Sequence, residues 1–135
     1  MATTIEAIIP SLLQEHARLF VGYPIVFDDD VLEAPEDAYI QGNYLPNVVD
    51  NLFIGNEATV RYQGLFQLTV VARPGDGFIR AADIAGGLVN HFPKGLALRE
   101  NPVTVKVYAK PSVAAPITVN FQLRIPVTIP WRSFN

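Results

Sequence analysis

The longest run of alternating side chains in the sequence covers residues 117–131. From Val119 to Trp131 every second residue is apolar, and the residues between them are polar or proline. Because side chains alternate between the two faces of a β-strand, this pattern predicts one long strand with a fully apolar face. Pro126 and Pro130 cannot donate a hydrogen bond to a neighbouring strand, so we expect a sheet edge from Pro126 onward. An uncovered apolar edge strand would aggregate, which favours a protein that associates with copies of itself.

The residues before this run predict two helices and further strands. Apolar residues three and four positions apart predict helices over residues 3–20 and 78–92. Pro10 lies inside the first of these, so either the helix is kinked there or its main part begins at Pro10. Strands are predicted over residues 23–27, 39–45, 59–72 and 103–108. This order predicts an α+β fold, a mainly antiparallel sheet with both helices packed on one face.

The predicted strand over residues 59–72 has one dry face and one mixed face. Phe66, Leu68 and Val70 share the dry face. The other face carries polar residues but also Leu65 and Val71, so it is only partly suited to water.

Length and composition set further limits. The 135 residues predict a single domain over residues 1–135. Half of the residues are hydrophobic and only 17% are charged, against about 25% in a typical domain, which favours a permanent partner. The absence of cysteine excludes disulfides, thiolate zinc sites and a cysteine nucleophile. No apolar stretch is long enough for a membrane span and the start does not resemble a signal peptide, so no membrane contact is expected.

Charge is divided unevenly along the chain. Ten acidic residues and one arginine give residues 1–57 a net charge of −9, whereas three acidic and nine basic residues give residues 58–135 a net charge of +6. The two halves can pack together and neutralise each other. Alternatively, opposite faces of the subunit carry opposite charge, and copies then associate head-to-tail into a ring. The overall charge of −3 argues against a dedicated nucleic-acid binder.

No catalytic or metal-binding motif stands out. His16 and His91 lack the spacing of a paired metal site, so we expect structural or exposed roles for both. Three consecutive acids at residues 28–30 do not match a calcium loop, and residues 75–77 are too short for a phosphate-binding loop. No serine lies in a nucleophile-elbow context. These observations favour a structural protein over an enzyme, with no cofactor and no metal.

Several segments of the second half resemble one family. They are Tyr62-x-Gly64-x-Phe66-Gln67, Pro74-x-x-Gly77, His91-Phe92-Pro93-Lys94-Gly95 with Leu98, and Pro126-Val127-Thr128-Ile129-Pro130-Trp131. Together they are similar to the pattern of phage tail terminator-like proteins. The resemblance covers most of the chain in order, and it departs from the family over a longer acidic and Asn-rich stretch at residues 28–57.

The resemblance implies a subunit that assembles as a ring, commonly of six copies, at the head-proximal end of a phage tail tube. Such a ring stops tube polymerisation and joins the tail to the head. The implied partners are copies of the chain, the tail tube protein and a head–tail connector or neck protein. DNA would pass through the lumen without specific binding. The implied location is the virion tail, after assembly in the host cytoplasm.

An acidic lumen would suit a DNA channel, because it repels the phosphates that slide past it. We therefore take eight residues as candidates for the lumen or for an interface: Asp28, Asp29, Asp30, Glu33, Glu36, Asp37, Arg73 and Arg80. Two alternatives remain open at this point. One is a small cytosolic α+β ligand-binding domain or enzyme, and the other is a different tail ring subunit, such as a tube or neck protein.

Overall fold

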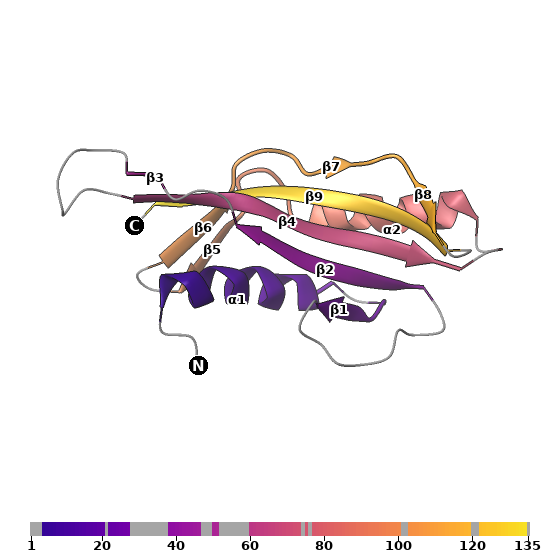
Figure 1. Cartoon of the computed structure of the whole chain (residues 1–135), viewed down its shortest axis with the longest axis horizontal. Coiled ribbons are helices and arrows are strands. Elements are labelled where there is room, and N and C mark those ends of the chain that lie inside the picture. The colour runs from indigo at the N-terminus through magenta and orange to yellow at the C-terminus, as the bar shows by residue number, and fades with distance from the viewer. Residues whose placement is uncertain are drawn as a thin grey trace.

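A single mainly antiparallel sheet dominates the computed structural model of the chain (Figure 1). The structure describes residues 4–20, 22–27, 38–46, 50–51, 60–73, 75, 77–100, 103–119 and 122–134. The helices of this part are α1 (Ile5–Arg18) and α2 (Phe78–His91). The strands are β1 (Ile25–Phe27), β2 (Tyr39–Pro46), β3 (Asp50–Asn51), β4 (Val60–Ala72), β5 (Ala97–Glu100), β6 (Val103–Val107), β7 (Ser112–Val113), β8 (Ile117–Val119) and β9 (Gln122–Phe134). The α+β class and the mainly antiparallel pairing are thus confirmed; only β1 and β2, among the described strands, pair in parallel.

Strands β4 and β9 form the centre of the sheet. They run side by side from the pair Arg61 and Phe134 to the pair Ala72 and Leu123 (Figure 1). Strand β2 pairs with the other edge of β4. The free side of β9 is shared by three short strands, β8, β7 and β6. The expectation that this proline-bearing strand lies at an edge is therefore wrong.

Pro126 and Pro130 fit inside the sheet because their nitrogen atoms face away from β4, toward the side of β9 where short strands leave gaps in the pairing. The amide of Ala114 donates to the carbonyl of Pro126 at 2.9 Å, so the backbone polar groups of Pro126 face away from β4. Pro130, four residues later, faces the same way. Strand β7 pairs at Val127 and Thr128, which leaves both prolines outside the β7, β8 and β6 pairings. Neither proline therefore removes a bond from the long β4–β9 ladder.

The alternating run of residues 117–131 is two strands rather than one. Val119 of β8 pairs with Gln122 of β9, so the chain reverses direction between them. Paired residues project to the same face. Val119 therefore lies on the same face as Gln122 and Arg124, and not with the buried row that begins at Ile125. The side chain of Val119 is 42% exposed. The predicted continuous strand is wrong. The turn between Val119 and Gln122 leaves the alternation of apolar and polar residues in the sequence unbroken, but the apolar residues before the turn project to the opposite face of the sheet from those after it.

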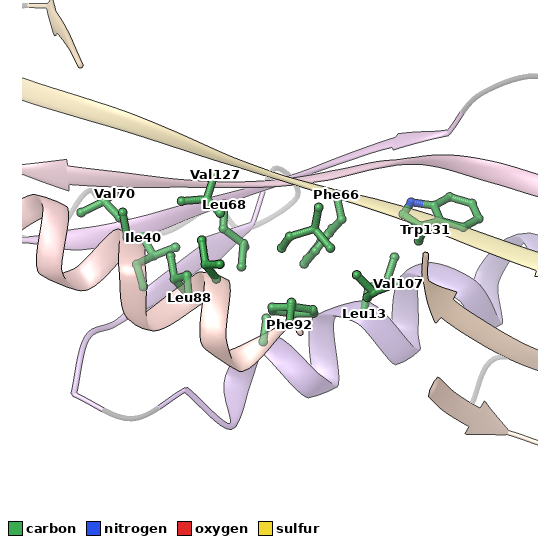
Figure 2. Close-up of a cluster of buried hydrophobic side chains, with 14 of the residues drawn as sticks. Leu13, Ile40, Phe66, Leu68, Val70, Leu88, Phe92, Val107, Val127 and Trp131 are labelled. Atoms are coloured by element: carbon green, nitrogen blue, oxygen red, sulfur yellow. The ribbon is translucent and has the colours of Figure 1, made fainter. Parts of the chain in front are cut away.

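The hydrophobic core is one cluster that contains buried residues of both helices and of the sheet strands. Figure 2 shows Phe66, Leu68 and Leu88 pointing into the space between the strands and the helices. All three are fully buried. The helices contribute to this cluster Ile8, Ile9, Leu12, Leu13, Ala17, Ala81, Ile84, Ala85, Leu88 and Val89. Helix α1 continues through Pro10, so the alternative in which its main part begins at that proline is wrong.

Candidate interaction surfaces

The interface residues predicted from the sequence fall mainly outside the described chain. Asp28, Asp29, Asp30, Glu33, Glu36 and Asp37 all lie outside the residues that the structure describes. Arg73 follows the end of β4 and is half-buried, and Arg80 is exposed in the first turn of α2. Both arginines thus flank the β4–α2 connection, and their role at an interface stays a prediction.

An apolar row crosses the sheet on the face opposite Phe66 and Leu68. We call this face the outer face. Leu45 of β2 pairs with Leu65 of β4, and Leu65 pairs with Pro130 of β9. Leu45 is 44% exposed and Leu65 is 40% exposed. Three adjacent strands therefore present apolar side chains to solvent in one line, which marks a surface suited to protein contact.

A basic region lies beside this row on the outer face. Lys106 of β6 pairs with Arg132 of β9, and Arg132 pairs with Gln63 of β4. The guanidinium carbon of Arg132 lies 3.9 Å from the centre of the Tyr108 ring. The ring holds the guanidinium against the sheet by a cation–π contact, so its charge has a fixed position beside the apolar row.

The far end of the outer face carries a polar network. Arg124 donates to the side-chain oxygen of Gln41 at 3.0 Å and to that of Gln122 at 3.2 Å. Beside it, Ile117 and Val119 of β8 are 51% and 42% exposed. The outer face therefore combines apolar and polar contacts, as protein interfaces do.

The two histidines lie together although 75 residues separate them. Their rings stack with centres 4.2 Å apart and planes 19° from parallel. The Nε2 of His16 donates to the carbonyl of His91 at 2.7 Å, and the Nε2 of His91 donates to the carbonyl of His16 at 2.5 Å. The rings of Phe20 and Phe92 contact the pair edge-on. This reciprocal arrangement ties together the C-terminal ends of α1 and α2.

Burial lowers the pKa of His16 below its ordinary value of 6.5. The hydrogen bond to the carbonyl of His91 opposes this shift, whereas the charge of the His91 ring adds to it. Glu15 and Arg99 line the shallow cleft beside His16. The folded state therefore keeps His16 neutral at pH values where the unfolded chain already binds a proton.

We expect the free energy of unfolding to fall as the pH is lowered from about 7.5 to about 5, because the unfolded state then binds more protons than the folded state. Urea unfolding at a series of pH values measures this effect. His16→Phe, which keeps a ring but cannot titrate, is expected to flatten the pH dependence. An equally steep dependence in that variant would contradict the assignment to His16.

The described residues contain no group of three or more histidine, cysteine or acidic side chains that could hold a metal ion. Among them, neither helix has the length and apolar character needed to cross a membrane.

Comparison with known proteins decides the family. A family model described as phage tail terminator protein matches residues 4–131, nearly the whole chain. The chain belongs to the phage tail terminator family. It is therefore a structural protein of the virion tail, as its sequence resemblance predicts.

Two solved structures share the fold of this family member. One chain is 20% identical, covers 97% of this chain over 96% of its own length and superposes with a TM-score of 0.78. A chain from the virion of a native gene transfer agent particle is 12% identical, covers 99% of this chain and 100% of its own, and has a TM-score of 0.64. No curated protein matches the chain.

Sequence reasoning missed the apolar row and the histidine pair of this family member. The position of Leu65 on the mixed face of its strand was the sequence signal for the apolar row. Its neighbours in the row, Leu45 and Pro130, are identified only by the pairing of the strands. No sequence signal links His16 to His91, because the contact joins two helix ends that are far apart in the chain.

Proposed function

We propose that this chain is the subunit of a ring, hexameric as the family resemblance implies, at the head-proximal end of the tail tube. The ring stops tube polymerisation and joins the tail to a head connector or neck protein. The family match over residues 4–131 is the observation that carries this proposal.

The distribution of buried residues supports it. We infer that α1 and α2 cover the same face of the sheet, since their buried residues belong to one cluster with Phe66, Leu68 and Val70 (Figure 2). This leaves the outer face, with Leu45 and Leu65, for contact with a neighbouring subunit or the tube. Exposed leucines rimmed by charged and polar residues are typical of such contacts.

The charge division of the sequence supports a head-to-tail contact between copies. Residues 1–57 are strongly acidic, and the described body is rich in lysine and arginine. A contact of this kind joins two different surfaces and closes into a ring when the rotation between copies allows it. The acidic residues at 28–37 are then placed at the lumen, where they repel passing DNA, or at a rim that meets a partner.

The test of the ring is the mass of the protein in solution, measured by light scattering with and without purified tail tubes. We expect a multimer alone or on contact with tubes, and tubes capped at one end in electron micrographs. A protein that stays monomeric and leaves tube growth unchanged would overturn the proposal.

Reversal of the acidic charges is expected to hinder ring assembly or DNA passage. The variant Asp28→Lys, Asp29→Lys and Asp30→Lys replaces three repulsive carboxylates with groups that attract phosphate. Ring mass and the infectivity of particles built with the variant measure the two steps separately. Unchanged rings and unchanged infectivity would count against a lumen or interface role for this stretch.

A further inference from the structure

A small cavity lies between the first turns of α1 and the ends of three strands. Its volume is about 150 Å³. Glu6 and Ile9 of α1 line one side, and Tyr44, Tyr62 and Trp131 of the sheet line the other. The cavity is large enough for one side chain and too small for a typical metabolite.

The walls of this cavity are aromatic and held in place. The rings of Tyr44 and Trp131 stack with centres 5.7 Å apart and planes 12° from parallel. Trp131 is only 1% exposed. Gly64 pairs with Trp131, and a Cβ at Gly64 would lie 2.9 Å from its Cζ2 atom, so the glycine makes room for the indole. The tryptophan therefore has a fixed position as a wall of the cavity.

A negative charge stands beside these rings. Glu6 is exposed and lines the cavity together with Tyr44. Burial, with a further contribution from the charge of Glu6, raises the pKa of Tyr44 to about 12. Glu6 lies in the first turn of α1, where a negative charge also interacts favourably with the helix dipole. That interaction does not require the aromatic side chains that surround the cavity. Aromatic faces attract cations, and a carboxylate beside them adds to the attraction while it repels anions.

We propose that this cavity is a socket for one cationic side chain, an arginine or a lysine, of a neighbouring copy of the chain. The source of the cation rests on the proposed ring. In the described part of the chain six lysine and arginine residues are exposed, against three acidic residues, of which Glu6 is one. A second copy therefore offers exposed lysine and arginine side chains that complement the charge of Glu6, and the aromatic lining favours a long side chain because it buries the alkyl stem.

The chemistry of the socket is tested on the free protein. Trp131 is the sole tryptophan, so its fluorescence reports on the cavity alone. We expect N-ethylguanidinium at millimolar concentration to change the emission, and N-ethylurea, its uncharged analogue, to bind more weakly. Glu6→Gln should weaken guanidinium binding about fivefold. Glu15→Gln, which changes another exposed acid of α1, should leave it unchanged. Equal responses to both compounds, or to guanidinium in both variants, would overturn the proposal.

The source of the cation is tested during assembly. We expect ring formation to change the emission of Trp131, and Glu6→Gln to raise the protein concentration needed for assembly about fivefold. Rings that leave the emission unchanged and tolerate Glu6→Gln would overturn the socket while the ring stands. If the wild-type protein forms no ring, with or without tubes, the cation does not come from a neighbouring copy and the proposed function is overturned. This holds even where the cavity binds guanidinium.

Discussion

Replacement of Gly64 by valine is expected to destabilise the fold by about 3 kcal/mol, the upper part of the range for overpacked interiors. Gly64 is buried in β4. A Cβ there would lie 2.5 Å from the carbonyl oxygen of Leu45 and 3.0 Å from the Cα of Pro46, and both are backbone atoms. Backbone atoms inside a sheet cannot move aside without breaking the β2–β4 ladder. Urea unfolding followed by circular dichroism measures the loss.

Gly86→Ala provides the matched control for this variant. Gly86 lies in α2, and a Cβ there meets no atom within 4 Å. Alanine favours the helix over glycine, so this variant is expected to gain up to about 1 kcal/mol. A Gly64→Val protein as stable as the wild type would show that the β2–β4–β9 packing is looser than the structure indicates.

Substitution of Leu65 by aspartate is expected to weaken ring assembly at least about thirtyfold while the subunit stays folded. Leu65 stands at the centre of the apolar row, between Leu45 and Pro130. Because it is 40% exposed, the subunit tolerates a polar side chain there, but an interface would bury the new carboxylate without a partner. Light scattering over a range of protein concentrations, with and without tail tubes, measures assembly, and circular dichroism checks the fold.

Ile79→Asp serves as the control for the apolar row. Ile79 is 79% exposed on α2 and does not belong to the apolar row. We expect it to change assembly far less than Leu65→Asp does. If Leu65→Asp forms rings at the wild-type concentration, the outer face is not the contact between copies.

The elements with strong local patterns were predictable from the sequence. The strands predicted over residues 39–45 and 59–72 correspond to β2 and β4, and the helix predicted over 78–92 corresponds to α2. Periodicity reports which face of an element is buried, and that depends mainly on neighbouring residues in the chain. The family resemblance, carried by short segments of the second half, also pointed to the family that the comparison shows.

Strand partners were not predictable in the same way. Pro126 and Pro130 suggested an edge, but β9 is central because the missing donors face interrupted pairings. A proline excludes one hydrogen bond on one side of a strand, and the sequence does not say which side that is.

The sequence by itself determined the helices, most of the strands, most of the apolar core positions and the family, because each of these depends on residue type and local spacing. Only the tertiary structure decided the row of Leu45, Leu65 and Pro130, the stacked pair of His16 and His91, and the aromatic cavity beside Glu6. These features join residues that are distant in the chain. Their geometry is set by strand register and helix packing, which no local pattern encodes.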